Sequence, residues 1–437
     1  MKHSSVKLKA CGQVLLILIA VIYVSDSLLN FILRHSVNLP FSDQWDLLFT
    51  PVPIDQRSFS SLFFHQHGPH YQGLSFIFDS LMCRFTSWNI RYTSIMTGVW
   101  LILAGIAALG LSKKVSGSLC IALASFLLVC SKNFHETILI TNNASHSIFA
   151  TFLLFVLISN SLDLERKIKL IFHCLLTWLI AFSGFGLVYL LLEPINLYFL
   201  KLHKVKRQFL AVIGLNYLAI LCVFLSFYRS VEAFPGSKLS IFEKISAILD
   251  FIIALLGSFW FSNEVYKTFL GYLSLFALIL IVIHLASTLF KEKNTNNAIK
   301  YSRFLLLTFW SVGLLIICAY GRADWGTYNA GASRYMIFSA PLWFVFLNIF
   351  PLNNLYKLIP GLLALILVTS NSLVIRPEEL NLIRGFKKTK RTFIQRYIST
   401  GNFEASKAQL PFLELGMTEN RLLHLKQHKL AIFKKKL

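Results

Sequence analysis

The chain carries repeated runs of about 20 apolar residues, the length that an α-helix needs to cross the hydrocarbon core of a bilayer. Only 14% of its residues are charged, against about 25% in an ordinary soluble domain, which argues against a large soluble core. A backbone inside lipid must satisfy its own hydrogen bonds, and a helix does so within one segment. The sequence therefore predicts an all-α integral membrane protein.

About 11 transmembrane helices (10–12) are expected from these runs. They are 10–33, 92–111, 116–131, 144–160, 168–200 divided in two, 209–228, 268–290, 304–320, 335–350 and 355–375. The run 168–200 divides at Ser183-Gly184-Phe185-Gly186, because paired glycines weaken a helix and permit a tight reversal. The run 245–261 contains Asp250 and is expected to be re-entrant or to lie on the outer surface, with a true span as the alternative.

Lysine and arginine clusters beside the runs set the orientation, because cytoplasmic loops are enriched in positive charge. Lys7 and Lys9 precede the first run, which places the N-terminus in the cytoplasm. With eleven spans, the transmembrane domain 1–375 is followed by a small basic helical tail, 376–437, on the outside. The basic residues after the last span favour instead a twelve-span chain with the tail inside, and a solvated tail near anionic headgroups is a third interpretation.

The net charge of +22 is explained by these clusters, so the lipid bilayer is an expected partner and nucleic acid is not. The seven cysteines show no metal-ligand spacing. The sequence contains no Walker or dinucleotide fingerprint, so an ATP-driven pump or a membrane dehydrogenase has no support. The polar loops between the apolar runs are therefore the candidate positions for acid/base chemistry.

The first predicted outer loop, 34–91, is longer than a simple connection needs, and such loops are kept mainly for function. It is expected to contain juxtamembrane helices, and it carries Asp43 and Asp46, which share one face if their segment is a short helix. A partly desolvated carboxylate there can accept a proton from an attacking hydroxyl or bind a divalent metal. The plainer alternative is a helix cap beside a solvated acid.

Three histidines, His65, His67 and His70, follow in the same loop, and Gly68-Pro69 between them bends the chain and brings the imidazoles together. Contact with a phosphate or a sugar is the first interpretation, a solvated loop the second and a metal site the third. Without a cysteine or a carboxylate at fixed spacing, the His-x-His-x-x-His pattern is a weak zinc signal.

A second polar cluster occupies the predicted outer loop 321–334. Arg322 stands at the end of one span, and Arg334 and Tyr335 stand at the start of the next. Two guanidinium groups at one membrane face can hold a pyrophosphate or a phosphodiester through bidentate hydrogen bonds. Alternatively, both side chains snorkel to the lipid headgroups.

An acidic stretch just beyond the first span, Phe41-Ser42-Asp43-Gln44-Trp45-Asp46, followed by His65-Gln66-His67-Gly68-Pro69-His70, resembles the GT-C class of polytopic glycosyltransferases. This class includes protein mannosyltransferases, oligosaccharyltransferase catalytic subunits and bacterial aminoarabinose transferases. The helix break at Ser183–Gly186, the Ser333-Arg334-Tyr335 helix start and the ending 422–433 are similar to uncharacterised bacterial members. The likeness covers most of the chain through short motifs. A shorter length and the absence of a large C-terminal periplasmic domain leave the acceptor open.

The resemblance implies an enzyme of the bacterial cytoplasmic (inner) membrane that moves a sugar from a polyprenyl-phosphate donor to a glycan, lipid or protein acceptor at the outer face. Asp43 best matches the family's acidic residue, as general base or metal ligand, and Asp46 is second. Arg334 and Arg322 match the contacts to the lipid phosphate. No cofactor is implied apart from a divalent metal, whose requirement stays open. The alternative is a flippase, another transporter or a polymerase of lipid-linked surface glycan.

Overall fold

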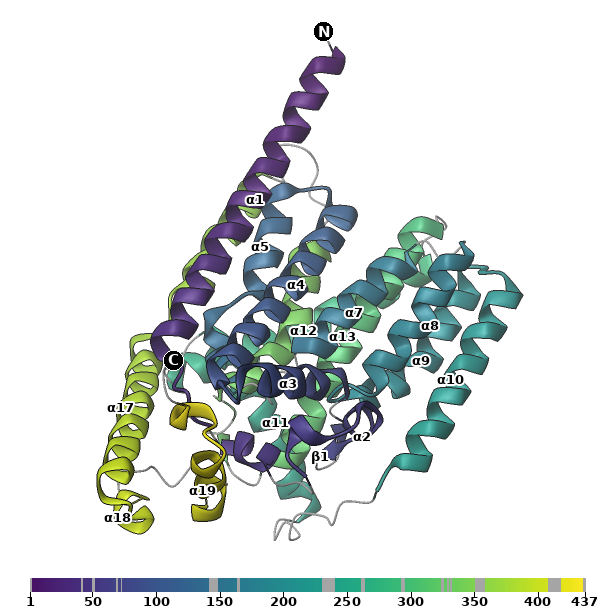
Figure 1. Ribbon diagram of the computed structural model, residues 1–437. Helices are drawn as coiled ribbons and strands as arrows, with labels where there is room; N and C mark the ends of the chain where they lie inside the picture. The colour runs from purple at the N-terminus through teal and green to yellow at the C-terminus, as the bar shows by residue number, and fades with distance from the viewer. Residues whose placement is uncertain are drawn as a thin grey trace.

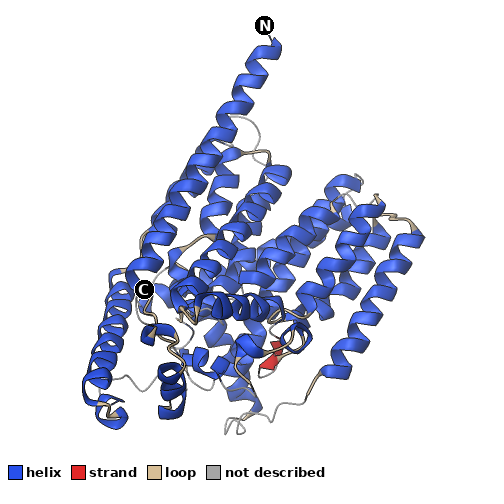
Figure 2. Ribbon diagram, in the orientation of Figure 1, coloured by secondary structure: helices blue, strands red, loops and turns tan. Residues whose placement is uncertain are grey.

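The computed structural model describes residues 2–40, 42–48, 52–67, 70–71, 73–140, 148–162, 166–229, 240–260, 264–291, 295–323, 326–327, 330, 332–349, 358–407 and 418–434. Helices make up nearly all of its regular structure (Figure 2). The only strands among these residues are β1 (Gln66–His67) and β2 (His70–Tyr71), which form an antiparallel hairpin, and an isolated antiparallel bridge joins Tyr71 to Gly184. The predicted all-α architecture is confirmed.

Within the described ranges, seven segments are long and apolar enough to cross a membrane. They are Cys11–His35, Ile90–Ser116, Leu119–Leu139, Arg207–Phe227, Val265–Leu289, Ala298–Arg322 and Gly361–Thr400. Large apolar side chains stand exposed along them, such as Ile22 (66% exposed) and Leu215 (67%), as expected of a surface that faces lipid. The chain is a multi-pass membrane protein.

The longer helices of the bundle are α1 (Lys2–His35), α4 (Ile90–Ser116), α5 (Leu119–Val129), α10 (Arg207–Phe227), α12 (Glu264–Lys291), α13 (Thr295–Arg322) and α16 (Leu358–Leu373). The shorter ones are η3 (Lys132–Phe134), α6 (His135–Leu139), α7 (Ile148–Ser161), α8 (Lys167–Ala181), α9 (Gly186–Leu202), α11 (Ile241–Ser258), α14 (Ser333–Met336), η7 (Ile337–Ser339) and α15 (Ala340–Ile349). Figure 1 shows them packed side by side, with the N-terminal part of α1 extending beyond the rest.

Local sequence explains where these helices turn. At the end of α4, Gly117 adopts a left-handed conformation (φ +68°), and its N–H donates to the Lys113 carbonyl over 3.0 Å. The next residue, Ser118, caps α5 by accepting the Ile121 N–H over 3.4 Å. α4 and α5 therefore form a tight antiparallel pair.

The first loop (residues 34–91) folds against the bundle through η1 (Ser42–Leu48), η2 (Ile54–Gln56), α2 (Phe59–Phe63) and α3 (Gly73–Thr86). Its hairpin binds the interruption between α8 and α9, where the Gly184 N–H donates to the Tyr71 carbonyl over 2.7 Å. A Cβ atom on Gly73 would lie 1.7 Å from the Phe182 carbonyl oxygen, so only glycine permits this close approach. The predicted break at Ser183–Gly186 is confirmed, because α8 ends at Ala181 and α9 begins at Gly186.

The side of the bundle that carries the first loop is called the loop side below. η3 and α6 lie there beside the end of α16. The Asn133 side-chain amide donates to the backbone carbonyl of Asn371 in the last turn of α16 over 2.6 Å. Both ends of α11 contact elements of this side. Its Lys244 ammonium lies 4.6 Å from the ring of Tyr320 near the end of α13, and its Ser258 carbonyl accepts a hydrogen bond from Arg376 over 2.7 Å. α11 therefore begins and ends on the loop side.

The C-terminal tail follows as α17 (Pro377–Thr400), α18 (Phe403–Lys407), α19 (Glu419–Gln427) and η9 (Ala431–Phe433), all on the loop side in Figure 1. Its apolar side chains share one buried cluster with the first loop. This shared cluster contains Leu39, Trp45, Leu47, Leu48, Ile54, Leu62, Phe76, Ile77, Cys83, Trp88, Ile90, Phe393, Ile394, Tyr397, Phe403, Leu422, Leu425 and Ala431. At the far end, the Ala431 N–H donates to the Ser87 carbonyl over 2.9 Å. The tail thus covers the first loop directly.

Candidate functional site

The first loop and the second polar cluster, which we call the arginine loop (residues 321–334), approach one region of the loop side. The His70 imidazole lies 4.0 Å from the Phe185 ring, centroid to centroid. Phe185 meets Phe338 at 5.1 Å, and Phe338 meets Tyr335 at 6.1 Å. A continuous row of aromatic contacts therefore joins the histidine segment to the residues that follow the arginine loop, although the two lie far apart in the sequence.

The two arginines gather around one tyrosine. The Arg322 Nε donates to the Tyr335 hydroxyl over 2.9 Å, and the Arg334 guanidinium lies 5.0 Å from the centre of the Tyr335 ring. Tyr335 is buried, whereas both arginines are only partly covered. The arrangement places two permanent cations at the surface around a fixed phenol, which suits the binding of an anion.

Glu136 on α6 is a residue of this region that the sequence reasoning missed. Its carboxylate accepts the Arg334 backbone N–H over 3.3 Å, and its own N–H donates to the Ser333 hydroxyl over 2.8 Å. These two bonds tie α6 to the first turn of α14, so Glu136 positions the segment that carries Arg334. The only sequence signal was the polar stretch from Lys132 to Glu136 after an apolar run.

A further acid–base pair lies beside Glu136. The His135 Nε2 is 3.3 Å from the Glu379 carboxylate at the start of α17, and His135 is almost fully buried. Arg376, which precedes α17, interacts electrostatically with Glu379 and donates to the carbonyls at the end of α11. α6, α11 and α17 are therefore joined by polar contacts next to the arginine loop.

The histidine segment does not present its described imidazoles to one point. The His65 Nδ1 accepts a hydrogen bond from the Arg57 guanidinium over 3.1 Å and its ring stacks on Phe76 of α3, whereas His70 packs on Phe185. The side chain of His67 lies outside the described part. Within the described ranges, no group of three His, Cys, Asp or Glu side chains converges in a way that could hold a metal ion.

Asp43 and Asp46 both belong to η1, but their side chains lie outside the described part. The backbone between them is anchored by Trp45, which is 0% exposed and belongs to the cluster shared with Phe393 and Tyr397 of α17. The tail therefore holds the short helix that carries both candidate carboxylates.

Asp79 on α3 is a second carboxylate that the sequence did not single out. It is 6% exposed, and its Oδ2 is buried without a hydrogen-bond partner among the described atoms. Burial raises the pKa of its carboxyl from 3.8 to about 7. The first loop thus encloses an acid that exchanges a proton near neutral pH.

This shift predicts a pH-dependent stability. Between about pH 4 and pH 7 the folded protein keeps a proton on Asp79 that the unfolded chain has released, so the contribution of Asp79 to stability should fall as the pH rises through this window and level off above it. Asp79→Asn should remove this contribution and stabilise the protein at pH 8 by up to roughly 4 kcal/mol relative to wild type. Melting temperatures in detergent between pH 4 and pH 8 measure the effect. Glu404→Gln, at an exposed carboxylate of α18, is the control, and an unchanged slope in Asp79→Asn would contradict the prediction.

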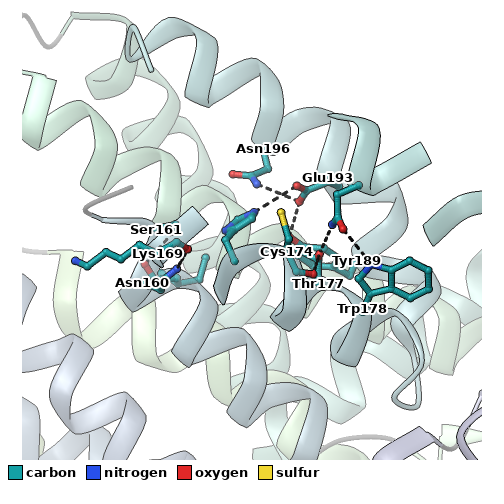
Figure 3. Close-up of polar contacts among 12 residues, drawn as sticks. Asn160, Ser161, Lys169, Cys174, Thr177, Trp178, Tyr189, Glu193 and Asn196 are labelled. Atoms are coloured by element: carbon teal, nitrogen blue, oxygen red, sulfur yellow. Dashed lines mark hydrogen bonds and ion pairs between the residues drawn. The ribbon is translucent and has the colours of Figure 1, made fainter. Parts of the chain in front are cut away.

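A buried polar network crosses the bundle away from the arginine loop (Figure 3). Glu193 of α9 accepts hydrogen bonds from the Tyr189 hydroxyl and, over 3.0 Å, from the Asn196 amide. Its other carboxylate oxygen lies 3.6 Å from the Nε2 of His173 on α8. Arg303 of α13 donates to the Asn196 side-chain oxygen. All of these side chains are buried, so α8, α9 and α13 are joined by ionisable groups inside the bundle.

No family model matches this chain, and no curated protein or solved structure resembles it closely enough to count as a relative. The resemblance to GT-C enzymes therefore stays a prediction from the short sequence motifs described above. The function is argued below from the geometry of the loop side.

Proposed function

We propose that the protein is a GT-C-like glycosyltransferase, which moves a sugar from a polyprenyl-phosphate donor to an acceptor at the outer face of the bacterial cytoplasmic membrane. The observation that carries the proposal is the row of contacts from His70 through Phe185 and Phe338 to Tyr335. Through these contacts the histidine segment, which follows the acidic η1, and the cationic arginine loop lie on the same side of the bundle. A transferase of this kind needs an acid/base group and a phosphate site together.

The proposed topology has eleven crossings, with the loop side facing outward. The seven membrane-length segments supply seven crossings, and α7, α8, α9 and the continuous α14–α15 region supply the other four. Lys113 and Lys114 at the end of α4, Lys201 at the end of α9 and Lys291 at the end of α12 then face the cytoplasm, which follows the usual charge rule. α11 stays on the outer side, and so does the tail.

In the proposed mechanism the acceptor hydroxyl oxygen attacks the anomeric carbon while the bond from that carbon to the phosphate oxygen breaks. Asp43 takes the proton of the hydroxyl, and the polyprenyl phosphate leaves with its charge stabilised by Arg334 and Arg322. Glu136 acts as a positioning residue, because its bonds to Ser333 and the Arg334 backbone fix the arginine segment. His65, His67, His70 and Tyr335 are assigned to substrate binding around this centre. Asp46 is the second candidate for the catalytic carboxylate, and a divalent metal held by Asp43 is the alternative role for that residue.

The direct test is reconstitution in proteoliposomes with a radiolabelled sugar on polyprenyl phosphate. Transfer predicts loss of the lipid-linked label, formation of a new glycosidic bond and release of unlabelled polyprenyl phosphate in equal amounts. Protein inactivated by heat serves as the control. If labelled donor persists unchanged across a panel of glycan, lipid and peptide acceptors, the transferase proposal is wrong.

A flippase or transporter of lipid-linked glycan is the second candidate, and the network around Glu193 favours it. Ionisable groups buried between transmembrane helices often mark transport pathways, and His173, Glu193 and Arg303 are such groups. The same vesicles separate the two functions. A transporter would move intact lipid-linked glycan between leaflets without any new glycosidic bond, and replacing Glu193 would stop that movement.

A further inference from the structure

A cavity of about 520 Å³ opens between the last turn of α1 and α17, which extends beyond the end of α1 in Figure 1. It is rich in basic side chains, namely Arg34, His35, Arg384, Lys387, Lys388 and Arg391. No carboxylate is among the described residues that line it. Five permanent positive charges therefore face one space, and they repel one another unless an anion lies between them.

The cavity is built by fixed contacts between its two walls. The Lys387 ammonium donates to the Arg34 backbone carbonyl, and the Lys390 ammonium donates to the Pro40 carbonyl over 3.3 Å. The Nδ1 of His35 is buried without a hydrogen-bond partner among the described atoms. α17 is thus held against the end of α1 although the cations of the two helices repel one another. His35 lines the cavity with one ring nitrogen that makes no hydrogen bond to the described atoms.

The position of the cavity indicates where its ligand comes from. Arg34 and His35 are the last residues of the membrane-length segment Cys11–His35, so the cavity lies where that helix leaves the hydrocarbon. Leu33, which directly precedes Arg34, and Leu29, about one turn earlier, are 49% and 41% exposed. An anionic group in the cavity and an acyl chain along these leucines would belong to one amphipathic molecule.

We propose that this cavity binds the headgroup phosphate of an anionic membrane lipid and so ties α17 to the bilayer surface. Arginine guanidinium groups match phosphate oxygens in bidentate geometry, and lysines add point charge. Each basic residue at such a surface contributes about a fivefold gain in binding to anionic lipid. The site is separate from the arginine loop, and its test uses no sugar donor, so its outcome is independent of the proposed function.

The test measures lipid retained by the purified full-length protein in detergent, by native mass spectrometry with added phosphatidylglycerol. The variant combines Arg384→Gln, Lys388→Gln and Arg391→Gln, and it should bind this lipid on the order of 100-fold more weakly than wild type. Single substitutions at Arg391 and at Arg396 form a matched pair, because both are exposed arginines of α17 and only Arg391 lines the cavity. Arg391→Gln should weaken binding about fivefold, and Arg396→Gln should leave it within about twofold. Melting temperatures check that every variant is folded.

Two further arms identify the source of the anion. Zwitterionic phosphatidylcholine should bind more weakly than phosphatidylglycerol, and millimolar inorganic phosphate should not displace the bound lipid. Displacement by inorganic phosphate would overturn the lipid assignment in favour of a soluble anion. Equal retention of phosphatidylglycerol by wild type and the triple variant, or equal losses in Arg391→Gln and Arg396→Gln, would overturn the site itself.

Discussion

Replacing Asp43 by Asn is expected to slow the proposed sugar transfer by about 10²–10⁴-fold, the usual contribution of a positioned general base. The amide keeps the size of the side chain but cannot take the proton of the acceptor hydroxyl. The backbone of η1 should stay in place, because Trp45 is fully buried in the cluster shared with the tail. Initial rates of donor consumption in proteoliposomes measure the effect.

Asp46→Asn provides the matched comparison, since it makes the same chemical change three residues further along the same short helix. Its loss of rate is expected to be much smaller, because Asp46 is only the second candidate for the catalytic carboxylate. A wild-type rate in the Asp43 variant would remove Asp43 from the mechanism. Equal losses in both variants would point to a pair that acts as a unit, such as two ligands of one metal.

Replacing Arg303 by Met is expected to destabilise the fold by about 3–5 kcal/mol, because it removes a buried cation that offsets the charge of the buried Glu193 carboxylate. Arg303 is 2% exposed, donates to Asn196 and interacts electrostatically with Glu193. The methionine fills much of the same volume, so the expected loss comes from charge rather than from a cavity. Denaturant unfolding in detergent micelles provides the measurement.

A double variant separates charge from packing. Adding Glu193→Gln to Arg303→Met removes the charge left behind, and the pair should recover a substantial part of the stability lost by Arg303→Met alone. Lys201→Met is the control, because it removes an exposed cation at the end of α9 and should change stability by less than about 0.5 kcal/mol. An Arg303 variant as stable as this control would show that the network adds nothing to the fold.

The fold class was predictable because its signal is local. Apolar runs of membrane length leave little choice but helices, and the glycine pair at Ser183–Gly186 marked a real interruption. The sequence was less informative about α11, whose apolar composition suits a span although both of its ends contact the loop side. Contacts with α13 and with Arg376, distant in sequence, decide its course.

The site was less predictable because its contacts connect distant parts of the chain. Arg322, Arg334 and Tyr335 are close in sequence and were found as a cluster, and the structure gathers them. Glu136 was missed because its partners lie almost 200 residues away. Asp79 resembles any polar residue of an amphipathic helix, and only the packing around α3 reveals that it is buried.

The cluster shared by the first loop and the tail has a consequence for how the protein is made. The ribosome delivers the first loop early, whereas Phe393, Tyr397 and Leu422, which complete its core, emerge much later. Until they arrive, Trp45 and its apolar neighbours lack part of their covering, and η1 lacks its support. The acidic segment is therefore fully supported only once the tail has been made, so a product truncated before α17 would keep its membrane helices and leave η1 without this support.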